Sequence, residues 1–268
     1  MSTFKNKKVL ITGAASGIGK IMCRLALEKG ANIVMIDINK EALERVKTEF
    51  SSLGQLYAYP VDVSDLTQIT QMADTVKKEV GKIDILINNA GIVVGKYFNE
   101  HSLEQIEKTM AVNSLAPQYI THFFLQEMID HNEGHICTIS SMAGLISNPK
   151  MAVYVASKWA AAGWSDSLRL EMKQLHKKVK ITTILPYYIN TGMFDGVKSL
   201  IPILEPEKTA KKIIRAIEKE KIYLGMPWGF NFVRTMQGLL PIRLFDLIVG
   251  KWMGVYTTMN HFTGHQNK

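Results

Sequence analysis

Lys8-Val-Leu-Ile-Thr12-Gly13-Ala-Ala-Ser-Gly17-Ile-Gly19 is the stretch of sequence that decides the fold. An apolar, β-branched run is followed by three glycines and then by apolar residues at helical spacing. Gly13 permits a tight turn, Gly17 lets the backbone approach a pyrophosphate, and Gly19 allows close packing of helix against strand. Amides at the start of the helix favour an anion. The stretch therefore predicts a strand, a dinucleotide-binding turn and a helix.

Further strands and helices alternate along the rest of the chain. Apolar strands are expected at Lys8–Thr12, Ile33–Ile36, Leu56–Val61, Ile83–Ile87, His135–Ile139 and Val179–Leu185. Helices are expected at Ile18–Lys29, Lys40–Phe50 and Thr67–Val80, twice within Ser102–His131, and at Tyr154–His176. This order predicts an α/β fold with a mostly parallel, doubly wound (Rossmann) sheet and helices on both faces. Ligands should then bind at the carboxyl ends of the strands.

Composition and length indicate one globular domain. The chain has 268 residues, of which 47% are hydrophobic and 21% charged, and no proline- or glycine-rich linker divides it. We expect a single NAD(P)-binding domain over residues 1–268, with the substrate loop and an apolar C-terminal extension in residues 190–268.

Several other functions are disfavoured by the composition. The formal charge is +8, but the lysines are dispersed and no nucleic-acid reading motif is present, so no nucleic-acid partner is expected. Cys23 and Cys137 lie among apolar residues, which predicts buried free thiols. The histidines lack a ligand spacing, so no metal site is expected.

Asp37 ends the second expected strand and indicates the cofactor. A carboxylate there can accept hydrogen bonds from ribose hydroxyls and would repel a 2′-phosphate. Ser16 stands before Gly17, where a lysine or arginine could compensate for that repulsion. Both features favour NAD over NADP, although the nearby Lys40 softens the discrimination.

Several motifs occur together in order, and together they resemble the short-chain dehydrogenase/reductase family over nearly the whole chain. They are the glycine turn, Asp62-Val63, Asn88-Asn89-Ala90-Gly91, Asn113, Ser141 and Tyr154-Val-Ala-Ser-Lys158. The resemblance and the turn together predict cofactor contacts at Gly13, Ser16, Gly17, Ile18, Gly19, Asp37, Ile38, Asp62, Val63, Asn89, Ala90, Gly91, Tyr154, Lys158, Pro186, Ile189 and Thr191.

The resemblance also implies a catalytic tetrad of Asn113, Ser141, Tyr154 and Lys158. Tyr154 and Lys158 lie on one face of a helix, and we expect the ammonium to lower the phenol's pKa so that Tyr154 serves as a base. Ser141 can hold the substrate oxygen, and family spacing selects it over Ser140. Asn113 is expected, by carry-over from the family, to connect Lys158 to solvent through water.

The sequence departs from the family pattern after the sixth strand, where Tyr187 replaces a glycine. Thr191 and Ile189 still match positions that contact nicotinamide. A branch resembling retinol and 17β-hydroxysteroid dehydrogenases tolerates this replacement and carries a similar run to Asn190-Thr-Gly-Met-Phe194. That resemblance implies a lipophilic alcohol as substrate, retinoid-like, steroid-like or long-chain.

Residues beyond the strand ends predict an apolar substrate pocket near Tyr154. Its expected walls are Ile92, Val93, Met142, Tyr187, Tyr188, Met193 and Phe194, the last two on a mobile segment. Two other functions stay open: a general carbonyl or 3-oxoacyl reductase, which Asp37 disfavours, and a dinucleotide sensor without turnover, which an intact tetrad disfavours.

Apolar side chains crowd the region from Phe230 to Met253, with three cations against one acid. Pro241 divides the region into pieces too short to span a bilayer. The region could contact a membrane surface, cap the core, or form a subunit interface. We expect a cytoplasmic protein, with possible peripheral membrane contact, that forms a homodimer or homotetramer.

Overall fold

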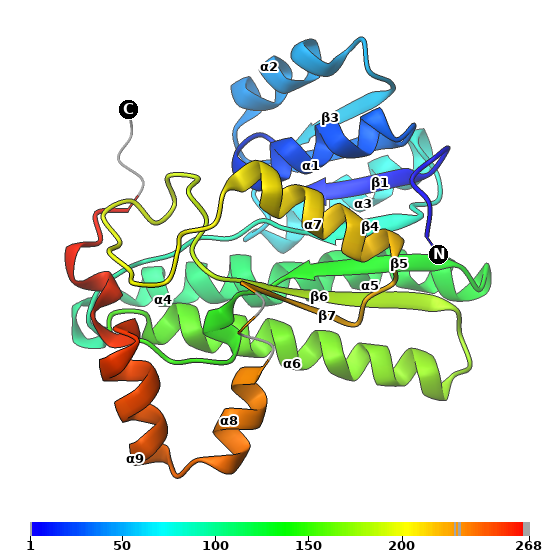
Figure 1. Ribbon diagram of the computed structural model, residues 1–268. Helices are drawn as coiled ribbons and strands as arrows, with labels where there is room; N and C mark the ends of the chain where they lie inside the picture. The colour runs from blue at the N-terminus through cyan, green and yellow to red at the C-terminus, as the bar shows by residue number, and fades with distance from the viewer. Residues whose placement is uncertain (1, 228, 230–231, 265–268) are drawn as a thin grey trace.

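A parallel sheet forms the centre of the molecule (Figure 1). The computed structural model describes residues 2–227, 229 and 232–264. Seven strands pair in the order β3-β2-β1-β4-β5-β6-β7, all in parallel. Their bounds are β1 Lys8–Thr12, β2 Asn32–Asp37, β3 Leu56–Pro60, β4 Ile85–Asn88, β5 Gly134–Ile139, β6 Val179–Pro186 and β7 Tyr223–Met226. The predicted doubly wound α/β sheet is confirmed, and its order reverses beside β1, where a ligand crevice is expected.

Helices cover both faces of this sheet (Figure 1). The longer ones are α1 Gly17–Glu28, α2 Lys40–Phe50, α3 Leu66–Glu79, α4 Leu103–Met110, α5 Ala116–Asp130, α6 Ala152–Gln174 and α7 Pro206–Glu218. The short segments are η1 Phe98–Glu100, π-helical η2 Ala111–Leu115, η3 Met142–Gly144, α8 Val233–Leu239, α9 Ile242–Phe245, π-helical η5 Asp246–Trp252 and η6 Val255–His261. One hydrophobic cluster joins α1, α2 and α7 to the sheet, and another joins α3, α5 and α6 to it.

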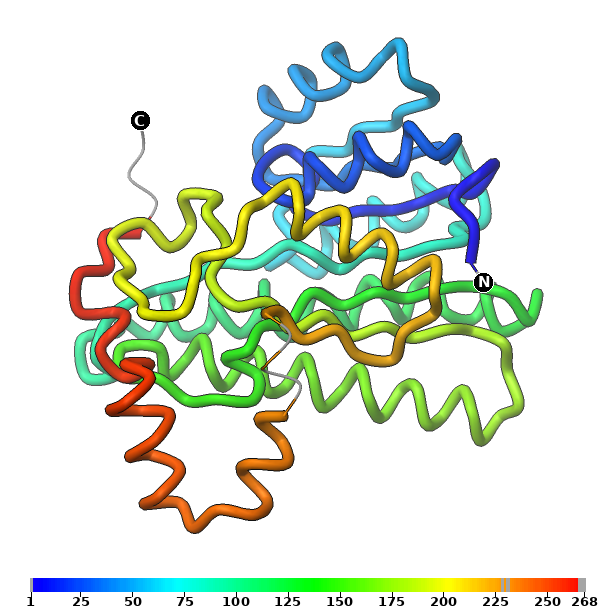
Figure 2. The backbone as a smooth tube through the Cα atoms, in the orientation of Figure 1, coloured from blue at the N-terminus to red at the C-terminus, as the bar shows by residue number. Residues whose placement is uncertain are grey.

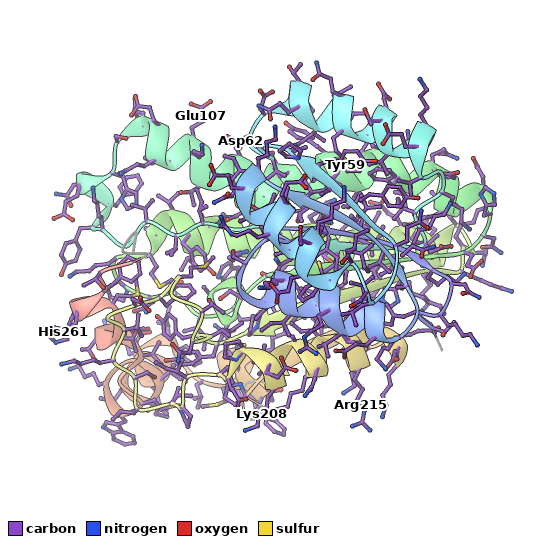
Figure 3. The ribbon with its side chains drawn as sticks, turned by 90° about the horizontal axis from the view of Figure 1, so that it is seen from above. Tyr59, Asp62, Glu107, Lys208, Arg215 and His261 are labelled. Atoms are coloured by element: carbon purple, nitrogen blue, oxygen red, sulfur yellow. The ribbon has the colours of Figure 1, made fainter. Side chains whose placement is uncertain are left out.

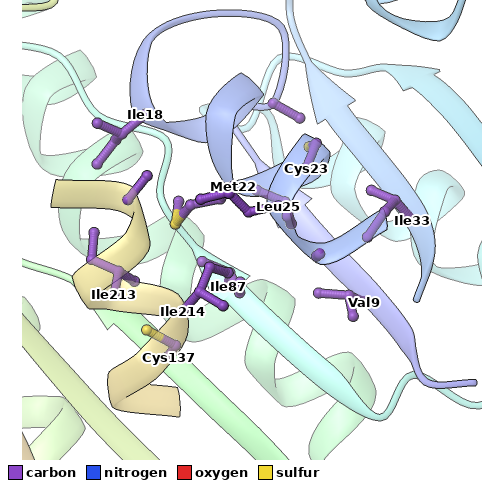
Figure 4. Packing of buried hydrophobic residues seen from close by; sticks show 14 of the residues in the cluster. Val9, Ile18, Met22, Cys23, Leu25, Ile33, Ile87, Cys137, Ile213 and Ile214 are labelled. Atoms are coloured by element: carbon purple, nitrogen blue, oxygen red, sulfur yellow. The ribbon is translucent and has the colours of Figure 1, made fainter. Parts of the chain in front are cut away.

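Alternation along β1 shows how the two cores form. Val9 and Ile11 belong to the cluster under α1 and α7, whereas Leu10 belongs to the cluster under α3 and α5, because successive strand side chains point to opposite faces. Both faces of β1 are therefore buried, so the strand can be apolar throughout. Figure 4 shows the first cluster, with the predicted buried thiols Cys23 and Cys137 inside it, both free.

Helix α7 packs along α1 with its apolar side inward. Ile213 and Ile214 are buried in the first cluster (Figure 4), while Lys208 and Arg215 project outward into solvent (Figure 3). Neither α7 nor β7 was predicted. Pro206 stands at the start of α7, a favoured position for proline, but only tertiary packing buries the apolar side. Strand β7 has only four residues, of which Gly225 and Met226 are buried while Tyr223 and Leu224 are partly buried, so it carries no long apolar run.

The expected pair of helices within Ser102–His131 is present, but no loop separates the two. Helix α4 passes through the π-helical segment Ala111–Leu115 directly into α5. Such π-helical turns are rare overall, and many of those that do occur lie at functional sites. The other expected elements match the observed ones with ends shifted by a few residues at most, as for α6, which begins at Ala152 rather than Tyr154.

Candidate active site

A cavity opens at the carboxyl ends of β1, β4, β5 and β6. It is lined by Gly13, Ser16, Gly17, Ile18, Gly19, Asn89, Ala90, Gly91, Ile139, Ser140, Ser141, Met142, Ala143, Ile146, Asn148, Met151, Tyr154, Lys158, Pro186, Tyr187, Tyr188, Ile189, Thr191, Met193, Phe194 and Val255. The cavity thus connects the glycine turn to the expected catalytic and apolar residues. Its place beside the reversal of strand order is where doubly wound sheets bind ligands.

The glycine turn has the geometry of an anion cradle. Gly13 and Gly17 have φ angles of 64° and 51°, which disfavour residues with a Cβ. A Cβ on Gly19 would lie 1.9 Å from the carbonyl oxygen of Gly13, so α1 can approach the turn only with glycine there. Ser16 caps α1 without a side-chain hydrogen bond. The first amides of α1 are therefore available to an anion such as a pyrophosphate.

The end of β4 holds this turn in place. Asn89 donates through Nδ2 to the carbonyl oxygens of Thr12 and Gly13, at 2.9 and 3.1 Å. The hydroxyl of Thr12 accepts from the amides of Asn89 and Ala90, at 2.9 and 3.0 Å. The Asn-Asn-Ala-Gly motif therefore fixes two neighbouring strand ends relative to each other. Asn89 therefore both holds the glycine turn in position and lines the cavity.

Asp37 lies at the end of β2, next to the turn. Its carboxylate accepts from the amide of Ala15 at 3.0 Å and from the amide of Asn39 at 3.0 Å. These bonds orient the carboxylate and leave it further lone pairs for ribose hydroxyls. Asp37 and the neighbouring exposed Ile38 are not among the residues that line the cavity.

Asp62 and Val63 follow β3 and are likewise absent from the cavity lining. Burial opposes ionisation of Asp62, but hydrogen bonds from Ser64 and Lys108 outweigh it, so the pKa of Asp62 is lowered. The amide of Val61 donates to the carbonyl oxygen of Asp37 at 2.9 Å. The ends of β2 and β3 are therefore adjacent, and an elongated ligand starting in the cavity could continue along them.

Tyr154 and Lys158 project from α6 into the cavity, and both are buried. The ammonium nitrogen of Lys158 donates to the carbonyl oxygen of Ile139 at 3.1 Å and lies 5.7 Å from the centroid of the Tyr154 ring. Ser141 accepts from the amide of Ala143 at 3.1 Å and donates to the carbonyl oxygen of Pro186 at 3.4 Å. That second bond is long, so the hydroxyl can be redirected to a ligand.

Asn113 lies on the π-helical segment η2, behind the cavity rather than in its lining. Its Oδ1 accepts from the amide of Ile92 at 2.8 Å, and its Nδ2 donates to the carbonyl oxygen of Ile92 at 2.8 Å and to the hydroxyl of Ser157 at 3.0 Å. Ser157 donates in turn to the carbonyl oxygen of Tyr154 at 2.7 Å. Asn113 therefore ties the segment after β4 to the helix that carries Tyr154.

The expectation that Lys158 lowers the pKa of Tyr154 is wrong for this structure. Burial raises the pKa of Tyr154 above its ordinary value, and hydrogen bonding with Ser141 only opposes this. Burial also lowers the pKa of Lys158 to about 8. Removal from water favours the neutral form of both groups, and the ammonium is directed at Ile139 rather than at the phenol.

Five of the seven residues expected to wall the substrate pocket line the cavity: Met142, Tyr187, Tyr188, Met193 and Phe194. The ring of Phe194 packs edge-on against Tyr154 and Tyr188, with centroids 6.0 and 4.9 Å apart. Ile92 and Val93 are not in the lining and pack against two hydrophobic clusters instead. Ile92 is held there by its double hydrogen bond to Asn113.

Sequence reasoning missed a polar group in this cavity, Asn148. Its Nδ2 donates to the hydroxyls of Tyr188 and Thr258, at 3.0 and 2.8 Å. Thr258 belongs to the C-terminal segment η6, so the contact joins residues far apart in the sequence. Ile146, Met151 and Val255 were also missed. Of these missed residues, only Asn148 could have been inferred from the sequence, because it follows Ser141 on the same loop.

Comparison with known proteins places this geometry in a family. A family model described as short chain dehydrogenase matches residues 7–200. Epidermal retinol dehydrogenase 2 of Mus musculus is 40% identical over 269 residues, which cover 97% of this chain and 86% of that protein. Estradiol 17-beta-dehydrogenase 11 of Homo sapiens is 36% identical over 246 residues, which cover 91% and 82%.

The fold matches solved structures as well. A short-chain dehydrogenase/reductase from Burkholderia phymatum, in complex with NAD, superposes with a TM-score of 0.81 at 24% identity, covering 93% of this chain and 97% of that one. The chain therefore belongs to the short-chain dehydrogenase/reductase family and is an oxidoreductase with a nicotinamide dinucleotide cofactor. Within that family it is similar to the retinol and 17β-hydroxysteroid dehydrogenases, as the sequence motifs predicted.

Proposed function

We propose that this protein uses NAD to interconvert a lipophilic alcohol and its carbonyl form, with Tyr154 as the general acid and base. The observation that carries the proposal is one shared cavity. In it, the hydroxyl-bearing side chains of Tyr154 and Ser141 lie between a dinucleotide cradle and walls of methionine and aromatic side chains. Both hydroxyls can form hydrogen bonds with one substrate oxygen while the rest of the substrate contacts apolar surface.

In the oxidative direction Tyr154 removes the proton of the substrate hydroxyl, and Ser141 donates a hydrogen bond to the same oxygen. A nicotinamide held in the cavity would supply the acceptor for the hydride that leaves the carbinol carbon. The O–H electron pair becomes the second bond of the carbonyl, so one proton and one hydride leave together. In reduction Tyr154 returns the proton. Because burial raises the pKa of Tyr154, its resting form is the proton donor needed for reduction.

Lys158 and Asn113 contribute to this step by positioning the helix that carries Tyr154. Lys158, whose pKa of about 8 keeps it largely charged at neutral pH, donates to the carbonyl oxygen of Ile139 at 3.1 Å and so holds α6 against the end of β5. Asn113 is a positioning residue, because it bridges Ile92 and Ser157. This bridge holds the helix that carries Tyr154 and Lys158 at a constant distance from the end of β4.

The preference for NAD rests on Asp37. The amide of Ala15 holds its carboxylate beside the glycine turn, where the 2′-position of the adenosine ribose is expected in this fold. A 2′-phosphate would meet a fixed negative charge there. Lys20 on α1 cannot easily compensate, since it forms an ion pair with Glu49 at 2.7 Å.

The lipophilic substrate is supported by the walls of the cavity and by the names of the relatives, which are a retinol dehydrogenase and an estradiol dehydrogenase. Removing apolar surface from water contributes about 0.8 kcal/mol per methylene group. The hydroxyl of Tyr188 and the amide of Asn148 form a polar patch among these walls, and the buried hydroxyl of Thr258 accepts a hydrogen bond from the same amide. Such a patch would orient a substrate that carries a second polar group.

A substrate panel tests this proposal. Retinoid, steroid, long-chain and short polar alcohols would be assayed with NAD and with NADP, following the absorbance of the reduced cofactor. We expect turnover with lipophilic alcohols and NAD, and a loss of at least about a hundredfold in kcat for Tyr154→Phe, with NAD binding retained. Preference for short polar alcohols would contradict the lipophilic pocket. NAD binding without turnover of any alcohol or carbonyl would indicate a dinucleotide sensor.

A further inference from the structure

The C-terminal hairpin, residues 232–253, projects from the body of the molecule (Figures 1 and 2). It consists of α8, a turn at Pro241, and α9 continuing into η5. Its inner side is anchored: Val233, Phe245 and Val249 are buried in the same hydrophobic cluster as Tyr154. Gln237 also donates to the carbonyl oxygen of Leu145 at 2.6 Å. The hairpin is therefore fixed to the wall of the active-site cavity.

The outer side of the hairpin exposes large apolar side chains. Leu239 and Ile242, on either side of the turn, are 77% exposed, and Trp252 is 70% exposed. Further exposed apolar residues on this hairpin are Phe232, Leu244, Leu247 and Met253. Leu200, also 77% exposed, lies next to the base of the hairpin at Gly254. Single exposed apolar residues are ordinary, but a concentration of this kind marks a binding surface.

Cations accompany these apolar residues. Arg243 and Lys251 are exposed on α9 and η5, whereas the hairpin's acid, Asp246, accepts a hydrogen bond from the hydroxyl of Tyr256. Arg234 stacks over the ring of Tyr223, 4.6 Å from its centroid. The exposed charge beside the apolar tip is therefore positive, which complements anionic lipid headgroups.

A lipid surface fits this hairpin better than a second copy of the chain does. A two-fold contact would place the same positively charged surface of both copies, with Arg243 and Lys251 on each, against itself, and these like charges would repel. An interfacial segment buries its apolar side only about 5–10 Å deep and keeps its cations at the headgroups. No described helix is long and apolar enough to cross a bilayer, so contact through the hairpin would be peripheral.

We propose that the outer side of the C-terminal hairpin inserts into the interface of an anionic lipid bilayer. Through Val255, the segment that follows the hairpin also lines the catalytic cavity, so bilayer contact would bring the cavity close to the lipid phase. A lipophilic alcohol could then enter without crossing water. This last consequence rests on the function proposed above, whereas the membrane contact itself does not.

Vesicle sedimentation tests the contact without substrate or cofactor. The full-length protein would be mixed with vesicles of phosphatidylcholine alone or with added phosphatidylserine. We expect binding that is stronger to the anionic vesicles. The double variant Leu239→Ser/Ile242→Ser should lose about tenfold or more in partition coefficient on both vesicles. Leu103→Ser, which alters a 79% exposed leucine on α4, is the matched control and should bind like the wild type.

The charge contribution is tested separately with Arg243→Gln/Lys251→Gln. We expect about a fivefold loss per cation on anionic vesicles and little change on phosphatidylcholine. Failure of the wild type to bind either vesicle, or equal loss in Leu103→Ser, overturns the proposal. A dimer that dissociates in Leu239→Ser/Ile242→Ser, seen by analytical ultracentrifugation, assigns the surface to a second copy instead. Vesicle binding without turnover of any alcohol would contradict only the proposed function.

Discussion

Ser140 and Ser141 are neighbours in the sequence with separate roles in the structure. Ser140 is buried and donates to the backbone carbonyl oxygen of Lys158 at 2.8 Å, so it joins β5 to α6. Ser141 donates its hydroxyl proton to the carbonyl oxygen of Pro186 at 3.4 Å, which is long for such a bond. The buried hydrogen bond of Ser140 stabilises the fold, whereas the hydrogen bond of Ser141 can be replaced by one to the substrate. The two serines therefore form a natural pair for separating stability from catalysis.

Ser141→Ala is expected to lower kcat by about a hundredfold to a thousandfold, because the developing charge on the substrate oxygen loses a donor. Its thermal unfolding should change little. Ser140→Ala is expected to lower the free energy of unfolding by about 1–3 kcal/mol with a much smaller effect on kcat. Steady-state kinetics and chemical denaturation of both variants check this. A larger loss of kcat in Ser140→Ala would reverse the assignment.

Asp37→Ser should raise the use of NADP relative to NAD. The fixed carboxylate that repels a 2′-phosphate is removed, while the backbone amide of Ala15 keeps a hydroxyl partner within reach. The ratio of kcat/KM for the two cofactors measures the effect, and we expect it to shift toward NADP by at least about tenfold, the equivalent of about 1.4 kcal/mol. Equal or better use of NADP by the wild type would refute the role of Asp37.

At the scale of elements, the segment after β6 is expected to limit substrate size. Phe194 packs against Tyr154 and Tyr188 and forms part of the cavity wall. In a series of primary alcohols, kcat/KM should rise by up to about fourfold per added methylene until the cavity is filled. Phe194→Ala should flatten this rise. A flat or falling series in the wild type would favour a small polar substrate.

Helix α7 stabilises the fold through one apolar side. Ile213→Ala removes a fully buried side chain from the cluster shared with α1 and should lower the free energy of unfolding by about 2–5 kcal/mol. Arg215→Ala, on the solvent side of the same helix (Figure 3), should change it by less than about 0.5 kcal/mol. Urea denaturation of the two variants measures both values, and equal effects would show that α7 packs otherwise in solution.

At the scale of the whole molecule, His135 links stability to pH. It is buried on β5, where its ring contacts the hydroxyls of Ser2 and Thr182 at 3.1 and 2.8 Å. Burial lowers the pKa of His135 from 6.5 to about 4, the charge of Lys180 also lowers it, and Glu220 opposes both. His135 therefore stays neutral in the folded state at pH values at which it is protonated in the unfolded state.

Stability contributed by neutral His135 should be complete above pH 6.5 and fall as the pH decreases toward 4. The difference corresponds to about 3 kcal/mol. His135→Gln, which cannot take up this proton, should show a shallower loss over that range, whereas the exposed His131→Gln should follow the wild type. Urea denaturation at several pH values measures the slopes. Parallel slopes for all three proteins would show that another group is responsible.

Local sequence predicted those features whose cause is local. The glycine turn, the first six strands and the helix with Tyr154 and Lys158 follow from periodicity and from residue spacing along a single element. The α/β class follows from their order. The expectation of NAD also came from local sequence, because Asp37 and the glycine turn lie on consecutive elements whose connection in this fold is short, and it stays a prediction.

Tertiary structure alone decided what depends on contacts between distant segments. Asn148 enters the cavity through bonds to Tyr188 and Thr258, and Ile92 leaves the expected wall because Asn113 binds its backbone. Burial, not the neighbouring ammonium, determines the direction in which the pKa of Tyr154 shifts. Desolvation and hydrogen-bond partners depend on every segment packed around a group, and a single stretch of sequence holds only one of those segments.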